Sequence, residues 1–131
     1  HGEPASIGDL DGHRIIAYGE AAPDVMKGIN WALALGHEGH PRAPTLSINN
    51  SHGVLQAVEA GAGIAALPTY LIRFSGRVKI VLPAIEGPVF RTYFTYPVEL
   101  RRSLRVAALR DFLSQRMNAA NLDIDRRALG V

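Results

Sequence analysis

His37-Glu38-Gly39-His40 places two histidines three positions apart, with an acid between them. A zinc protease uses such a pair only where both rings project from one face of a helix. Gly39 and the following Pro41 disfavour a helix, and no third ligand is nearby in the sequence. The segment is therefore expected to be a solvated loop, and we predict neither a metal site nor a cofactor.

Two further segments suggest catalysis or nucleotide binding, and in both the context argues against it. Ser51-His52 pairs a nucleophile with a base, but adjacent side chains rarely face each other and no G-x-S-x-G elbow is present. Residues 61–66 (GAGIAA) match a G-x-G-x-x-A string, which binds a dinucleotide where it follows a strand and opens a helix. Here a predicted helix precedes the string and a predicted strand follows it. We expect a tight helix-to-strand turn and no enzymatic activity.

The polar run Asn49-Asn50-Ser51-His52 is the most informative segment. It follows the predicted strand Thr45–Ile48 and opens a predicted helix. Ligands of parallel α/β sheets lie beyond the carboxyl ends of strands, and helix N-termini offer unpaired N–H groups. The run could therefore hold a carboxylate or another small anion. The same residue types also cap helices, and the local sequence leaves both roles open.

The elements that position this run alternate between strand and helix. Helices are predicted from Pro23-Asp24 to Gly36, from the polar run to Gly61, and over Thr69–Phe74. Short apolar runs predict four strands, at His13–Tyr18, Thr45–Ile48, Ile64–Leu67 and Val78–Leu82. This alternation predicts an α/β fold of three layers, with a mostly parallel sheet flanked by helices.

The C-terminal third has a different pattern. Val89–Tyr96 is aromatic and partly polar, which predicts a longer strand. An amphipathic helix is predicted after Ser103, with Leu104, Ala108 and Phe112 on one edge. Residues 118–131 are charged and weakly patterned, and we expect a frayed tail.

Composition limits the functional classes. Hydrophobic residues make up 47% and charged residues 20%, which is typical of a globular domain. The absence of cysteine excludes disulfides and thiolate chemistry. A net charge of +2 is weak support for a nucleic-acid surface, and the arginines near the last helix are expected to form a solvated face. No membrane span or signal peptide is visible, and since the chain does not begin with Met, we interpret it as a fragment.

Four segments together resemble the sensing domain of LysR-type transcriptional regulators. NNSHGVLQAVEAGAGIAALPTYL, which starts at Asn49, is similar to the family's signature stretch. HGEPASIGDLDGHRIIAY is similar to the approach to the first strand of the family's second lobe, and GRVKIVLP to a later strand. RTYFTYPVELRRSLRVAALRDFL is similar to the family's C-terminal ending. The four cover nearly the whole chain in the family's order.

The resemblance implies one lobe of a periplasmic-binding-protein-like (type 2) fold, with an effector in a cleft between two lobes. Residues 1–88 would be the second lobe, and residues 89–131 the return strand, helix and tail that pack on a missing first lobe. DNA would be read only by a missing N-terminal winged helix-turn-helix. The implied protein is cytoplasmic, without membrane contact, and the fragment is expected to self-associate as a homo-oligomer. The implied effector-binding residues are Asn49, Asn50, Ser51, Tyr18, Gly19 and Pro68, with His52 as an addition.

Two alternatives share parts of this pattern. A solute-binding protein of a transporter has the same two-lobe architecture, but would carry a secretion signal and no helix-turn-helix. A small α/β enzyme would need a convergent acid–base pair or a metal cluster, and the sequence offers neither. The resemblance favours a non-catalytic sensor of a small, anionic molecule.

Overall fold

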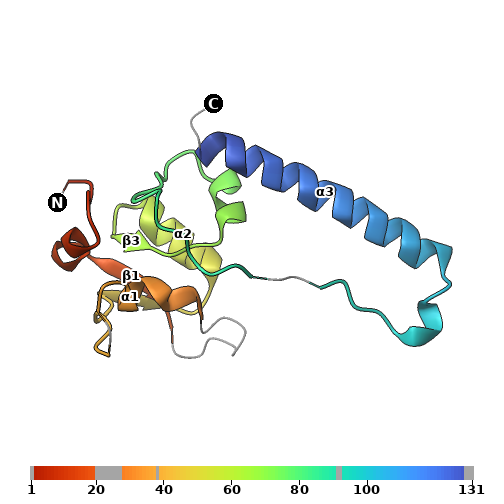
Figure 1. Ribbon diagram of the computed structural model, residues 1–131, viewed down its shortest axis with the longest axis horizontal. Helices are drawn as coiled ribbons and strands as arrows, with labels where there is room; N and C mark the ends of the chain where they lie inside the picture. The colour runs from red at the N-terminus through yellow and green to blue at the C-terminus, as the bar shows by residue number, and fades with distance from the viewer. Residues whose placement is uncertain (1, 20–27, 38, 91–92, 129–131) are drawn as a thin grey trace. The chain divides into compact units, whose positions relative to one another are not determined.

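The isoleucine-rich run near the start of the chain forms β1 (Ile15–Tyr18), the central strand of a parallel sheet in the computed structural model (Figure 1). The structure describes residues 2–19, 28–37, 39–90 and 93–128, without the side chains of 72–74 and 119–128. β1 lies between β2 (Leu46–Ile48) and β3 (Ile64–Ala65), in the order β2-β1-β3. Ile16 is opposite Leu46 on one side, and Ile15 is opposite Ile64 on the other. The predicted parallel sheet is confirmed for three of its four strands.

The core of this sheet lies around β1. Ile15 and Ile16 are each only 3% exposed although they point to opposite faces, so the strand is covered on both sides. Helix α2 (Ser51–Glu59; Figure 1) packs against β1, β2 and β3. Its buried residues are Val54 and Leu55. The other buried apolar side chains described are those of Pro4, Leu10, Ala17, Ile29 and Leu71. These contacts fix the strands relative to the helix that follows β2.

Helices precede and follow the strands as predicted, with shorter bounds. The described part of the first predicted helix is a 3₁₀ turn at 28–30 followed by α1 (Trp31–Ala34). Its predicted start at Pro23-Asp24 lies outside the described residues. Thr69–Phe74 forms a 3₁₀ helix, and another at Gly8–Gly12 was not predicted. The α/β class is confirmed.

The predicted strand at Val78–Leu82 is wrong. Residues 78–81 have no regular secondary structure, and Leu82 adopts a left-handed conformation with φ of 52°. Ile85 N–H donates to the Leu82 carbonyl at 2.9 Å, so the chain turns where the strand was expected to end. A strand needs a hydrogen-bonded neighbour as well as apolar residues, and the described residues supply none for this run.

Residues 89–131 form a second compact unit, separate from the unit of residues 1–88. The predicted strand Val89–Tyr96 is wrong for its described residues, 89–90 and 93–96, which pair with no other strand. A 3₁₀ helix at Val98–Leu100 precedes α3 (Leu104–Ala128; blue in Figure 1). The predicted helix is confirmed, but the tail expected to fray after residue 118 stays helical to Ala128. Ala, Leu and Arg, common in that stretch, are strong helix formers even without an apolar stripe.

Candidate functional site

The tip of β1 and the end of β2 meet at the carboxyl edge of the sheet. Gly19 N–H donates to the Ile48 carbonyl at 3.2 Å, which extends the strand pairing by one residue. A Cβ on Gly19 would fall on the side-chain oxygen of Asn49 and lie 2.9 Å from its Cγ. Glycine at this position therefore allows the Asn49 amide to lie against the backbone of β1. The structure brings together these two predicted site residues.

Asn30 holds the tip of β1 from the other direction. Its Oδ1 accepts from Tyr18 N–H and its Nδ2 donates to the Tyr18 carbonyl, both at 2.8 Å. The amide thus satisfies both backbone groups of a half-buried residue, as a neighbouring strand would do. Sequence reasoning missed Asn30. The sequence did contain a signal for such a role. Asn30 is a weak helix former that stands between the apolar residues Ile29 and Trp31 in a predicted helix, where a polar side chain needs a hydrogen-bond partner.

Asn50 is the N-cap of α2. Its backbone is extended, with φ of −152° and ψ of 144°, and its Oδ1 accepts from Gly53 N–H at 2.6 Å. Its side-chain oxygen is therefore engaged within the helix terminus, and the capping role is observed. Ser51 and His52 occupy the first turn, where backbone N–H groups have no partner within the helix.

The exposed side chains of Asn49 and His52 and the half-buried Ser51 leave this edge accessible. The first turn of α2 contains no acidic residue, so the partial positive charge of the helix terminus is not offset there. Pro68 lies three residues beyond the end of β3, and its carbonyl accepts from Leu71 N–H at 3.0 Å. The described contacts do not join Pro68 to Asn49 or Gly19.

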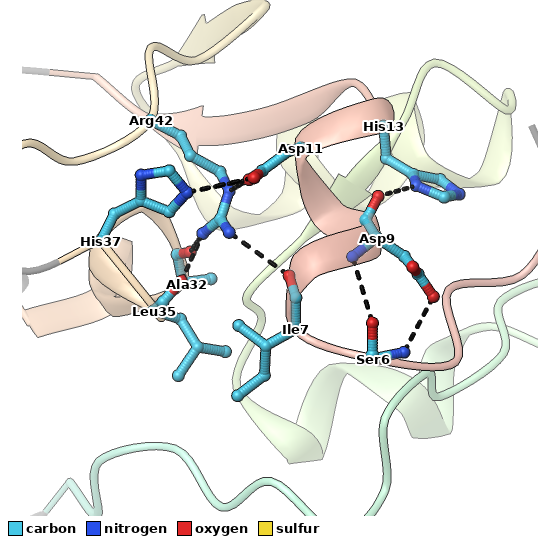
Figure 2. Close-up of polar contacts among 9 residues, drawn as sticks. All are labelled: Ser6, Ile7, Asp9, Asp11, His13, Ala32, Leu35, His37 and Arg42. Carbon is cyan, nitrogen blue, oxygen red and sulfur yellow. Dashed lines mark hydrogen bonds and ion pairs between the residues drawn. The ribbon is translucent and has the colours of Figure 1, made fainter.

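An ion cluster near the start of the chain holds the loop after α1 (Figure 2). Arg42 Nε donates to Asp11 Oδ1 at 2.6 Å, and His37 Nε2 lies 3.0 Å from the same oxygen. The Arg42 side chain is only 8% exposed, and its guanidinium also donates to the carbonyls of Leu35 and Ile7. The hydrogen bond from Arg42, with a smaller contribution from His37, lowers the pKa of Asp11. His37, proposed as part of a solvated loop, is thus fixed by an aspartate.

Asp9 closes the turn that leads into the same 3₁₀ helix. Its carboxylate accepts from the backbone N–H of Ala5 at 2.8 Å and of Ser6 at 2.9 Å. These two bonds lower the pKa of Asp9. The 3₁₀ helix Gly8–Gly12 is therefore fixed at both ends, by Asp9 and by Asp11, before the chain enters β1.

The other sequence motifs take the positions expected from their context. The Gly61–Gly63 turn follows α2 and precedes β3, the reverse of the order that a dinucleotide site requires. Within the described ranges, no group of three His, Cys, Asp or Glu residues could hold a metal. No helix in those ranges combines the length and apolar character needed to cross a membrane.

Comparison with known proteins gives one family match. A family model described as the LysR substrate binding domain matches residues 1–118. Searches of curated proteins and of solved structures returned no match. Members of the matched family have a periplasmic-binding-protein-like fold, which agrees with the parallel sheet and helices described above. Because the match extends over most of the chain, the chain belongs to the LysR substrate-binding domains, the effector-binding domains of LysR-type transcription regulators.

Proposed function

We propose that this domain senses a small anionic molecule at the edge formed by Tyr18, Gly19, Asn49 and Ser51. The contact of Asn49 with Gly19 carries the proposal, because it holds the Asn49 amide against the tip of β1, one residue before the N-cap of α2. Amide donors, a serine hydroxyl and the first N–H groups of a helix together suit a carboxylate. The effector itself is of the small-molecule class, as in the family.

The residues of this edge have different roles in the proposal. Asn49 and Ser51 contact the effector, and the N–H groups of the first turn of α2 receive its negative charge. Asn50 positions that turn through its bond to Gly53, and Asn30 fixes the tip of β1. His52 and Pro68 border the same edge. None of these groups needs to transfer a proton or attack a carbon, so the function is binding without catalysis.

The response follows from differential binding. The residue 1–88 unit is one lobe of the effector-binding domain, and the effector lies between it and a second lobe. The 89–131 unit contains the segment that returns to that second lobe. An effector with unequal affinity for two lobe arrangements shifts their populations, and paired subunits then present their DNA-reading modules differently. Family membership favours this regulator over a transporter's solute-binding protein.

The test is the effector response of an intact regulator that carries this domain. A reporter gene is measured in cells supplied with a panel of aliphatic and aromatic carboxylates. Asn49→Ala and Ser51→Ala are expected to abolish or strongly weaken the response, whereas Gln56→Ala, exposed on the same helix, keeps it. Responses equal to wild type in both site variants would show that the effector lies elsewhere.

A further inference from the structure

A pocket of about 450 Å³ lies at the opposite end of the sheet from the proposed effector site. It is lined by residues next to the amino ends of β1 and β3, including Arg14, Gly61 and Gly63. Parallel strands have their amino ends at one edge of the sheet and their carboxyl ends at the other. Neither Asn49 nor Ser51, which lie at the carboxyl edge, lines this pocket. Its volume is within the range of small-molecule sites, about 300–1,000 Å³.

The charged side chains that line the pocket are mostly cationic. Arg14 and Lys79 line the pocket together with a single carboxylate, that of Glu3, which pairs with Lys79 at 2.6 Å. Lys79 is 75% exposed, so this ion pair is of the weak surface type, which an incoming anion can replace. Among the described residues, no group forms a hydrogen bond or ion pair with the Arg14 guanidinium. The pocket therefore holds one uncompensated cation and one that is weakly paired.

The turn between α2 and β3 lines part of the pocket. Ile64 N–H donates to the Arg14 carbonyl at 2.8 Å, which fixes the backbone of Arg14 to the start of β3. A Cβ on Gly63 would collide with that carbonyl oxygen and lie 3.0 Å from the carbonyl carbon. Gly61 has φ of 76° and a Cβ there would meet nothing within 4 Å. Glycine at position 63 therefore allows the turn to lie against the Arg14 backbone, and Gly61 supplies the left-handed conformation of the turn.

We propose that this pocket is a second, independent binding site for a small oxyanion of the phosphate or polycarboxylate class. Arg14 supplies a planar, bidentate donor to the ligand, and Lys79, which also lines the pocket, supplies a point charge. His13, whose ring contacts the Asp9 and Gly2 carbonyls, borders the pocket without carrying the charge argument. This site is separate from the effector edge and does not depend on the proposed function.

The test is titration of the isotope-labelled 131-residue protein, followed by amide NMR shifts. Inorganic phosphate and citrate are added separately, each against sodium chloride of equal ionic strength. Saturable shifts of the Gly61, Ala62, Gly63 and Arg14 amides are expected with at least one anion, and the anion that saturates identifies the class. Arg14→Gln is expected to weaken binding by about tenfold or more, since it removes a charged hydrogen-bond pair.

Three variants separate the proposal from simpler explanations. Lys79→Gln should weaken binding less than Arg14→Gln, and Arg14→Lys should keep part of the affinity because the charge remains. Arg77→Gln, which removes an exposed cation outside the pocket, should leave affinity unchanged. Absence of saturable shifts, or affinity in Arg14→Gln equal to wild type in a folded protein, would overturn the second site.

Discussion

The side-chain oxygen of Asn49 lies where a Cβ would stand on Gly19, so the two residues cannot both carry side chains in this arrangement. Gly19 directly follows the central strand and Asn49 directly follows its neighbour, and the Gly19 N–H also donates to the Ile48 carbonyl. The edge proposed as the effector site thus depends on the parallel pairing, because the missing side chain of Gly19 makes room for the Asn49 amide beyond the neighbouring strand.

Gly19→Ala is expected to impair the effector response nearly as much as Asn49→Ala does. The new methyl group displaces the Asn49 amide, but Asn49 is exposed and can rotate away, so the free energy of unfolding falls by less than about 1 kcal/mol. Reporter response and chemical denaturation measure the two effects separately. Gly12→Ala is the matched control, since a Cβ there meets nothing within 4 Å. An unaltered effector response in Gly19→Ala would show that the position of the Asn49 amide does not matter for effector binding.

Asn30→Ala is expected to lower the free energy of unfolding by about 1–3 kcal/mol, because two part-buried backbone groups of Tyr18 lose their partners. The measurement is urea denaturation followed by circular dichroism. Gln56→Ala, an exposed helix position without such bonds, should change stability by less than about 0.5 kcal/mol. Equal stability of the two variants would mean that water replaces the Asn30 amide at the strand tip.

Arg42→Lys tests whether charge or geometry holds the loop after α1. The guanidinium reaches Asp11, Leu35 and Ile7 at once, and an ammonium group cannot reproduce that fork. Arg42→Lys is therefore expected to lose about 1–2 kcal/mol and Arg42→Ala about 1–3 kcal/mol, by thermal or urea unfolding. Arg77→Ala, an exposed arginine, is the control. If Arg42→Lys were as stable as wild type, the positive charge of residue 42, and not the geometry of the guanidinium, would account for its contribution to stability.

The pH dependence follows from Asp11. Arg42 and His37 lower its folded pKa below the ordinary value of 3.8, so the carboxylate stabilises the fold above that value. The contribution is lost progressively as pH falls below 3.8 and through the folded pKa. Asp11→Asn should therefore be less stable than wild type at pH 6, and the difference should shrink on acidification below pH 4. Because Asp9 titrates in the same direction, the difference between the two proteins is the quantity to measure. A difference that is constant with pH would contradict the assignment to this carboxylate.

The local sequence pattern was enough to predict those elements whose structure depends on residues close together in the chain. The apolar run at Ile15–Tyr18 and the cap at Asn50 were both predictable, because burial and helix termination are encoded within a few residues. Val78–Leu82 has the same apolar pattern but forms no strand, because pairing depends on a partner that local sequence cannot supply. Leu82 shows the consequence, since it turns the chain instead of extending it.

The candidate site was predictable only in part, for a related reason. Asn49, Asn50 and Ser51 could be proposed because they follow a strand and open a helix. The contact of Asn49 with the tip of β1 could not be predicted in this way, because it requires knowledge that residues 19 and 49, thirty positions apart, lie close together. Asn30 and Arg42 were missed because each acts on backbone groups that are distant in sequence. Because every residue type has a backbone carbonyl, the sequence does not reveal which residue such a side chain will contact.

The 89–131 unit leads to a prediction about self-association. No side chain described in this unit is buried, and large apolar residues are prominent among its exposed ones. Leu104 is 86% exposed, and Leu109 and Phe112 follow it on α3. A 25-residue helix with such residues uncovered is expected to bind another apolar surface. For the 131-residue protein, a second copy of the same chain is the available partner.

Light scattering at increasing protein concentration is therefore expected to show reversible association beyond the monomer. The double variant Leu109→Glu and Phe112→Glu should shift the protein toward monomer, because each charge would have to be desolvated in the interface. Ser114→Glu with Gln115→Glu adds the same charge at exposed polar positions of the same helix, and association should persist. If added negative charge alone prevented association, both double variants would be monomeric. A difference between them therefore reports the contribution of the apolar side chains of Leu109 and Phe112. A wild-type protein that stays monodisperse and monomeric at high concentration would contradict self-association through α3.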